Sequence, residues 1–551
     1  MMRAVGEAGH AAALAGDLHT AKRALDQLRA DSDGESPAWS LAIRATASML
    51  WPAAFAAPSA HEISCSLAAP NGSVARLALV EAVRRAVLAF ETDELATWIE
   101  LYERSLARDA NDPGAALWLA SARAWQALGR GELGDTGCEL ARVQRDALAL
   151  KIAPLVIEAT VQRSIAATLT GELGAGTELA RRASRMARTE GLPQQEFTAH
   201  LVLARARRLN RQPHLASRIL NALDQVVAPA WLPWLTWELS MAGELTPSGS
   251  RAAEPVDTSR ASRAARALTG LQQAAAAGNR AAFDCSVTAL RESTYGWAML
   301  EREASSLVAA LDFRSTEASD YPELSAWQRG ESTLPPPEIY GTCTGSAAGG
   351  DSNDGSEAYV LARPDAPPRR VLGLGMPLID LPGLIRLRRT RRRQGRVETV
   401  AAVIAAAGAD GVDQATCFER AYEIPWEADV HRGVFEVLLH RLRAYLEGTA
   451  ELVRREGRLS LQLGSPVLVP DPRCARPVFD RLLRVLARDG RLTAAEAATK
   501  TGLSVRAAQD ALKSLAADGA CTFEKAGRQL TYIVEDTTFS EPTQRLALQG
   551  A

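Results

Sequence analysis

Hydrogen-bonding and cationic side chains gather near the end of the chain, between residues 504 and 513. A helix over this stretch would carry Ser504, Arg506, Gln509 and Lys513 on its outward face. Hydroxyl, amide and guanidinium groups can bond to base edges, and Lys and Arg can neutralise phosphates. Further cations, Lys525 and Arg528, follow shortly afterwards. The set predicts contact with double-stranded DNA, although the nearby Asp510 would be repelled by phosphate.

The surrounding residues predict three helices and a hairpin. Helix-breaking glycines lie at positions 490, 502 and 519. Thr493 and Glu496 have the spacing of a capping box, and Ser504 can cap the third helix. The apolar positions of the first helix are Phe479, Leu482, Leu483 and Leu486, and those of the third are Val505, Ala508, Leu512 and Leu515. Residues 521–534 alternate like two strands around a glycine turn.

This order of elements resembles the winged helix-turn-helix of the MarR/ArsR-like families, over residues 473–540. The quoted stretch is "GRLTAAEAATKTGLSVRAAQDALKSLAADGA", followed by a "GR…Y" wing. The resemblance implies that the third helix enters the major groove and that the wing lies beside it. The alternative is a winged helix that makes only protein contacts.

A second unit of this kind is predicted at residues 371–465. "VLGLGMPLIDL" can form short leading strands, Val397–Ala407 a helix, and Asp413 the cap of the next helix. A third helix would repeat its apolar face at Val434, Leu438, Leu442 and Leu446, and a hairpin would turn at Glu456 and Gly457. The run "VLLHRLRAYLEGTAELVRREGRLSLQL" resembles the OmpR/PhoB-type winged helix. That resemblance implies base contacts by His431, Arg432, Glu436 and His440, and phosphate contacts by Arg441, Arg443, Arg454, Arg455 and Arg458.

An arginine cluster precedes this unit. Seven arginines lie within eleven residues, at positions Arg386, Arg388, Arg389, Arg391, Arg392, Arg393 and Arg396. They could bind phosphates and make binding depend strongly on salt. A solvated helix face, or a surface for the more acidic front of the chain, would explain the same cluster.

Residues 1–313 are expected to be helical and repetitive. Leu88, Leu128, Leu169 and Leu209 each precede a polar or glycine turn, at intervals of 40, 41 and 40 residues. Such a period predicts helical hairpins stacked into an α-solenoid, and it resembles the tetratricopeptide-like (TPR-like) repeats of bacterial regulators. The concave face of a solenoid is expected to bind a protein or peptide. In "WLPWLTW", Trp231, Trp234 and Trp237 either anchor such a partner or pack between repeats.

Residues 314–370 are rich in Pro, Gly and Ser and are predicted to be an irregular linker. The motif around Cys343, Gly-Thr-Cys-Thr-Gly, resembles a nucleophile turn but lacks the strand and helix that such a turn requires. Phosphate-binding, zinc-protease and serine-hydrolase motifs do not occur, and the seven cysteines form no CxxC pair. We therefore expect no catalytic residues, no cofactor and no metal.

The length and composition are typical of a multidomain protein without a membrane span. A chain of 551 residues with 47% hydrophobic residues exceeds the size of a single core. We expect neither a membrane span nor a signal peptide, and therefore a cytoplasmic, nucleoid-associated location. The net charge of −2 divides unevenly, because the part from residue 371 onward is basic and the rest is acidic.

The sequence thus predicts a mainly α fold, in which a TPR-like α-solenoid is followed by two small α+β winged-helix domains. Its predicted function is that of a sequence-specific DNA-binding transcription regulator with a protein or peptide partner, and homodimerisation would fit this function. The alternative is a non-enzymatic scaffold or adaptor that uses its winged helices for protein contacts. The two functions predict different behaviour. A DNA-binding regulator should lose affinity steeply as salt rises and should prefer one site, whereas an adaptor should bind a protein and ignore duplex DNA.

Overall fold

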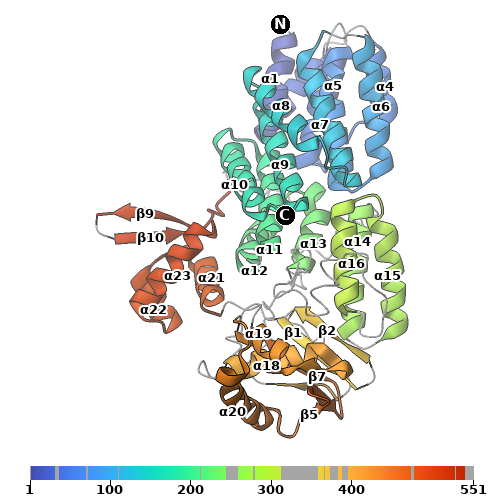
Figure 1. Ribbon diagram of the computed structural model, residues 1–551. Coiled ribbons are helices and arrows are strands. Elements are labelled where there is room, and N and C mark those ends of the chain that lie inside the picture. Colours follow the sequence, from blue (N-terminus) through green and yellow to red (C-terminus); the bar gives the residue numbers. More distant parts are fainter. Residues whose placement is uncertain are drawn as a thin grey trace.

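The computed structural model describes residues 2–30, 36–69, 72–108, 111–210, 212–242, 259–276, 279–311, 358–364, 366–372, 383–387, 395–422, 424–472, 477–527 and 529–539. Within these ranges the chain is mainly α, with small sheets confined to residues 358–533, which confirms the predicted fold class (Figure 1). No helix in these ranges combines the length and the apolar character that a membrane span needs.

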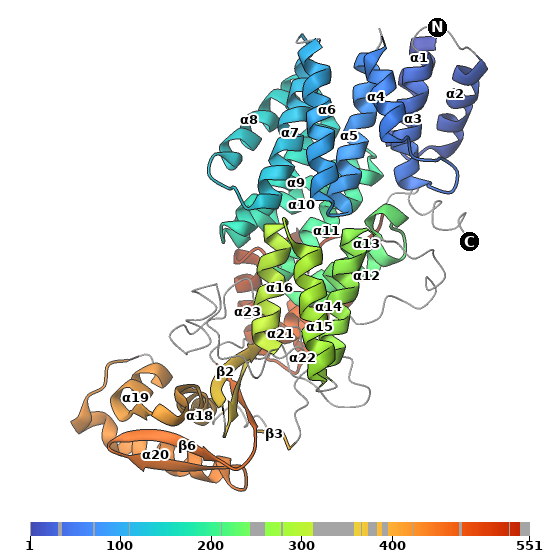
Figure 2. The same cartoon turned by 90° about the vertical axis from the view of Figure 1, so that its right-hand side faces the viewer.

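Antiparallel helix pairs follow one another from the N-terminus (Figures 1 and 2). The helices are α1 (Met2–Leu14), α2 (Leu18–Ala30), α3 (Ser36–Leu50), α4 (Ala60–Ala68), α5 (Gly72–Leu88), α6 (Thr92–Arg108), α7 (Pro113–Arg130), α8 (Thr136–Ala149), α9 (Ala153–Leu169), α10 (Leu173–Thr189), α11 (Pro193–Leu209) and α12 (Pro213–Asp224). The repeated leucines mark equivalent places, because Leu88, Leu169 and Leu209 end the first helix of a pair and Leu128 lies near the end of α7. The period of about forty residues therefore corresponds to one helical hairpin.

Helix α11 is buried along its entire length, from Pro193 to Leu209. It packs against α9, α10, α12 and α13 (Leu232–Met241). A helix that is buried on all sides usually carries apolar residues all round, but α11 also contains Glu196, Arg205, Arg207 and Arg208. Because an unpaired buried charge is costly, each of these groups needs a partner on another element.

Another buried polar group of α11 is His200, whose side chain is 2% exposed. Its Nδ1 lies 2.8 Å from the Glu196 carbonyl oxygen and donates to it. Burial is the main cause that lowers the pKa of His200 from 6.5 to about 4. The ring is therefore protonated more readily in the unfolded chain than in the folded chain.

This burial predicts a loss of stability in mild acid. His200 should contribute fully above pH 6.5, and the free energy of unfolding should fall by about 1.4 kcal/mol per pH unit as the pH drops from 6.5 towards 4. His200→Gln removes the titrating proton and keeps an amide that can donate to the same carbonyl. Thermal melts at pH 7 and pH 5 should show a smaller difference for this variant than for the wild type. Equal differences would mean that His200 does not cause the loss.

Helices α13 to α16 lie beneath the turns of the preceding hairpins (Figures 1 and 2). They are preceded by the short 3-10 helix η1 (Pro229–Trp231) and comprise α13, α14 (Arg260–Ala276), α15 (Arg280–Thr294) and α16 (Ala298–Leu311). Trp297 Nε1 donates to the Phe90 carbonyl at 2.7 Å, and Arg302 donates to the Leu169 carbonyl at 3.0 Å. Helices α14 and α15 also form a hairpin. This hairpin covers the side on which the turns of the earlier hairpins lie, and it does not continue their row.

The three tryptophans of "WLPWLTW" are fully buried. The indole N–H of Trp231 donates to Thr198, that of Trp234 to Glu238 and that of Trp237 to Glu303. This is the core-packing alternative of the sequence prediction. A partner could not reach these rings, so the anchor alternative is wrong.

A four-stranded sheet joins the helical front to the next unit. Its strands are β1 (Ala358–Arg363), β2 (Ala366–Leu372), β3 (Ile385–Arg386) and β7 (Val467–Asp471), in the order β2-β1-β7-β3. Alternate residues point to opposite faces, so Val360 packs in the core of the second unit while Leu361 joins that of the helical front. Both faces are thus covered by protein.

Strands β1 and most of β2 lie in the segment predicted to be an irregular linker, whose residues 314–357 fall outside the described residues. The prediction failed because β1 pairs with β7, which comes after an entire intervening unit, and β2 pairs with β1. The motif around Cys343 also falls outside the described part of the chain.

Candidate nucleic-acid interface

The C-terminal unit consists of the predicted helices and hairpin together with one short extra strand. Its elements are α21 (Pro477–Asp489), β8 (Arg491–Thr493), α22 (Ala494–Thr501), α23 (Val505–Ala517), β9 (Thr522–Ala526) and β10 (Gln529–Ile533). The strands form a sheet in the order β8-β10-β9. The β9–β10 hairpin extends beside the helices as a wing (Figure 1).

Local capping sets the positions of α22 and α23. Thr493 and Glu496 form both bonds of the predicted capping box. The hydroxyl oxygen of Ser504 accepts the Ala507 amide at 3.2 Å and begins α23. Gly502 has a φ of 66°, a left-handed conformation that a residue with a Cβ would adopt only at a cost. These caps make a tight turn between the second and third helices.

The predicted inward face of α23 needs one correction. Ala508, Leu512 and Leu515 are buried, as predicted, but Val505 is 53% exposed and Ala511 is buried. Val505 is the first residue of the helix and projects beyond the core, so its apolar character did not indicate burial.

The outward face of α23 is open. Arg506 and Lys513 are exposed, and Gln509 is half-buried. Ser504 is exposed too, but its oxygen already serves as the cap. Lys525 is exposed on β9, whereas Arg528 lies outside the described residues. The helix thus presents a guanidinium, an amide and an ammonium group to its surroundings, near an N-terminus whose dipole favours anions.

The helical front holds this unit at the opposite end of α23. Arg181 and Arg207 donate to the carbonyl of Gly519, two residues beyond the end of α23, at 2.8 and 2.9 Å. Arg218 of α12 donates to the Ala487 carbonyl of α21 at 2.9 Å. A helix of this length spans about 20 Å. The contacts therefore leave the N-terminal half of α23 uncovered.

Residues 481–520 match the family model described as winged helix-turn-helix DNA-binding. The chain carries a winged helix-turn-helix DNA-binding domain. The match includes most of α21, all of α22 and α23, and the face that contains Arg506, Gln509 and Lys513. Comparison with curated proteins and with solved structures found no match for the chain.

The preceding unit has the same order of elements. It contains α18 (Gly395–Ala407), the 3-10 helix η4 (Gly408–Asp410), β4 (Val412–Asp413), α19 (Gln414–Tyr422), α20 (Ala428–Leu446), β5 (Ala450–Arg455) and β6 (Arg458–Leu463). Its small sheet has the order β4-β6-β5, which corresponds to β8-β10-β9 of the C-terminal unit. As predicted, Asp413 caps α19 and the hairpin turns at Glu456 and Gly457, both with positive φ. Positive φ at both turn residues is typical of a type I′ hairpin.

His431 belongs to an aromatic cluster at the start of α20. Its ring stacks on Phe418 with 4.6 Å between centroids, and its Nδ1 accepts the Glu427 amide at 2.9 Å. Tyr422, Trp426 and Phe435 also contact the Phe418 ring. The structure thus gives this predicted base-contacting residue a packing role, which its sequence position did not indicate.

The other predicted arginine and histidine contacts of this unit are exposed, but two of the arginines also have partners within the unit. Arg432, His440, Arg441, Arg443 and Arg455 are exposed. Arg454 forms an ion pair with Glu436 at 2.9 Å and a hydrogen bond with Gln414, and Arg458 donates to the carbonyls of Asp410 and Gly411. A DNA contact by Arg454 would compete with these bonds.

Helix α20 also carries an exposed apolar ridge. Val430, Val434 and Val437 are 62%, 58% and 54% exposed, and their spacing places them on one side of the helix. The prediction that Val434 faces the core is wrong. The buried positions are Phe435, Leu438, Leu439, Leu442 and Leu446, so the core stripe is displaced by one residue at its start.

The arginine cluster lies mostly outside the described residues, including Arg388, Arg389, Arg391, Arg392 and Arg393. Arg386 is exposed on β3. The Arg396 guanidinium lies 4.2 Å from the centroid of the Tyr422 ring, in cation–π contact. At its C-terminal end, the cluster thus has a packing contact within the unit.

Proposed function

We propose that this protein is a sequence-specific regulator of transcription that binds double-stranded DNA through its C-terminal winged helix. The observation that carries the proposal is the open polar face of α23, within residues that match a DNA-binding family. The protein acts by binding rather than by catalysis, and it works in the cytoplasm on the nucleoid. Arg506 and Gln509 read bases, and Lys513 and Lys525 contact phosphates.

In this proposal the two halves of the chain have different roles. The helical front, which resembles TPR-like repeats, binds a protein or peptide partner. The unit at 395–463, with its OmpR/PhoB-like order of elements, contacts DNA beside the MarR/ArsR-like C-terminal unit. Two linked units raise the effective concentration of the second at its site once the first has bound. A homodimer would present two copies of this pair to a symmetric operator.

Selection from random duplexes by the full-length protein tests the proposal. The expected result is enrichment of one preferred sequence, with binding that weakens steeply as salt is raised. Recovery of no sequence, together with binding that does not respond to salt, would contradict it. Footprinting on the selected duplex would then show whether one or two segments are protected.

The two exposed lysines should govern salt dependence rather than sequence preference. Replacing Lys513 and Lys525 with alanine should weaken binding to selected and scrambled duplexes alike. The slope of log K against log salt should fall by about 1 for each lost phosphate contact. Arg142→Ala on α8, far along the chain from this face, is the matched control. An unchanged slope in the double variant would exclude both contacts.

A scaffold or adaptor is the second candidate, because the α20 ridge of Val430, Val434 and Val437 is apolar where a base-reading helix would be polar. Val434→Lys should then reduce capture of a protein partner and leave duplex binding by α23 unchanged. Stronger or weaker duplex binding in this variant would instead place the ridge next to DNA.

A further inference from the structure

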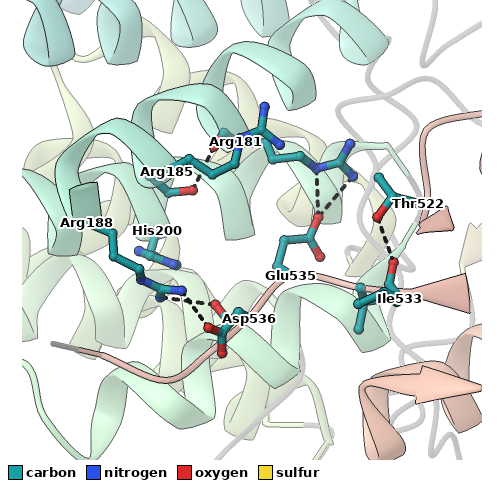
Figure 3. Close-up of a pocket in the computed structure, with 10 residues that line it drawn as sticks. Arg181, Arg185, Arg188, His200, Thr522, Ile533, Glu535 and Asp536 are labelled. Carbon is teal, nitrogen blue, oxygen red and sulfur yellow. Dashed lines mark hydrogen bonds and ion pairs between the residues drawn. The ribbon is translucent and has the colours of Figure 1, made fainter. Parts of the chain in front are cut away.

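The chain does not leave the C-terminal unit after β10 but crosses the helical front. Residues 535–539, here called the strap, run over α10 and α11 (Figure 3). The Glu535 carboxylate is 6% exposed and forms ion pairs with Arg181, at 3.1 Å, and with Arg207. Arg207 is itself fully buried. One carboxylate of the strap thus pairs with guanidinium groups on two neighbouring helices, and Arg181 also pairs with Glu178 of its own helix at 3.0 Å.

Two further side chains of the strap have defined partners. Asp536 forms an ion pair with Arg188 at 2.8 Å, and its other oxygen accepts the Thr538 amide, which bends the strap. Phe539 is 5% exposed, and its ring lies 5.1 Å from that of His200 and 6.3 Å from that of Phe197, centroid to centroid. The strap therefore presents two acids and, three residues after the second, an aromatic ring.

The surface under the strap requires an anion. Burial lowers the pKa of Arg207, while the Glu535 charge opposes this effect. For Glu535, burial raises the pKa, but Arg207 and Arg181 outweigh it and hold the pKa below its usual value. Without a carboxylate at this position, the fully buried Arg207 would lose this ion pair and face Arg181, whose other partner, Glu178, is largely exposed; this arrangement is unfavourable. The strap is thus a ligand that the chain supplies to itself.

Occupancy of this surface is coupled to the docking of the winged helix. The guanidinium groups that bind Glu535 also donate to the Gly519 carbonyl next to α23. Leu215 of α12 belongs to the core of the C-terminal unit. Displacing the strap would therefore remove one side of the contact that holds this unit to the helical front.

The strap leaves space beside it. A cavity of about 180 Å³ lies between the strap and α10, lined in part by Ser184, Arg185 and Thr522 (Figure 3). Arg185 is largely exposed. A segment with bulkier or additional acidic side chains would fill this space, so the intramolecular strap does not exhaust the binding capacity of the surface.

We propose that the α10–α11 surface, formed by Arg181, Arg188, Arg207, Phe197 and His200, is a recognition site for acidic–aromatic peptide segments. The chain's own residues 535–539 occupy it in cis, and a partner protein with two acidic residues followed three positions later by an aromatic one displaces them. Displacement undocks the winged helix from the helical front. The proposal specifies the class of partner that binds the helical front, and in this respect it rests on the proposed function. Its test uses no DNA and therefore succeeds or fails independently of DNA binding.

The probe is a labelled peptide with the sequence of residues 534–540, VEDTTFS, titrated into the full-length protein and followed by fluorescence anisotropy. Wild type should bind it weakly, because the tethered strap competes at high effective concentration. Phe539→Ala in the full-length protein weakens only the competitor and should tighten binding at least ten-fold. A peptide with alanine in place of phenylalanine should not bind. Equal affinity of wild type and a folded Phe539→Ala variant, or of the two peptides, would overturn the proposal.

Hydrogen exchange tests the coupling. Adding the VEDTTFS peptide to the Phe539→Ala variant should speed amide exchange around Ala487 and Gly519 and leave α5 unchanged. Peptide binding without faster exchange would refute displacement of the winged helix. A second variant, Arg207→Met added to Phe539→Ala, should lose peptide binding, and circular dichroism would verify that it folds. Retained binding in that folded variant would show that the peptide binds elsewhere and would overturn the site.

Discussion

Changing Arg506 and Gln509 together to alanine is expected to abolish the preference of the protein for its selected duplex. Each lost bidentate contact to a base edge should cost about 1–3 kcal/mol of discrimination. The fold should be unaffected, because Arg506 is exposed, Gln509 is only half-buried and the α23 core consists of Ala508, Leu512 and Leu515. Alanine is also a better helix former than either residue.

Competition binding, with selected and scrambled duplexes measured in the same salt, separates this effect from general weakening. Binding of the scrambled duplex should persist, supported by Lys513 and Lys525. Ser514→Ala, an exposed change on the same helix, is the matched control and should leave the preference intact. If the double variant still prefers the selected duplex, then the α23 face does not recognise bases.

The C-terminal unit was predictable because its determinants are local. Thr493 and Glu496 bond to each other's backbone, and Gly502 supplies a left-handed conformation that glycine adopts at little steric cost. Such signals span a few residues and do not depend on what packs around them. The helical hairpins of the front were predictable for a similar reason, since each repeat reproduces the same turn at the same spacing.

The features that the sequence did not reveal depend on contacts between distant segments. Strand β1 pairs with β7, which follows it in the chain only after a whole intervening unit. Likewise, nothing next to Glu535 indicates that it would meet Arg181 and Arg207, more than three hundred residues earlier. Helix α11 was predicted only as one helix of a repeat, whereas α13 and the strap also pack against it.

The exposed apolar residues show the limit of periodicity. Val434 and Val505 both fit a helical core stripe, yet both are exposed. Val505 is the first residue of its helix and lies beyond the core, whereas at Val434 the core stripe is shifted to the next residue, the buried Phe435. Periodicity indicates the direction of a side chain but not whether another element is present in that direction. His431 is the converse case, since a polar residue on a predicted outer face stacks on Phe418 instead.

The largest stability effect is expected from a buried ion network at the centre of the helical front. Arg205 and Arg208 of α11 form ion pairs with Glu238 of α13 and Glu303 of α16, and all four side chains are at most 3% exposed. The Arg208 guanidinium lies 2.6 Å from Glu238 and 3.0 Å from Glu303. Trp237 Nε1 also donates to Glu303, at 3.2 Å. The network thus joins three helices that are far apart in the sequence.

Glu303→Ala should therefore lower the free energy of unfolding by about 3–5 kcal/mol, because it leaves two buried guanidinium groups with the single carboxylate of Glu238 and hence one uncompensated buried charge. Glu303→Gln, which keeps an acceptor for Trp237 but not the charge, should fall between this variant and the wild type. The control is Glu139→Ala on α8. Glu139 lies 3.7 Å from Arg142 and both side chains are exposed, so this variant should change stability by less than about 1 kcal/mol. Thermal and urea unfolding of the full-length variants would measure all three. A Glu303→Ala variant as stable as Glu139→Ala would show that the guanidinium groups find other partners or water once Glu303 is gone, and that the network does not hold α11 to α16.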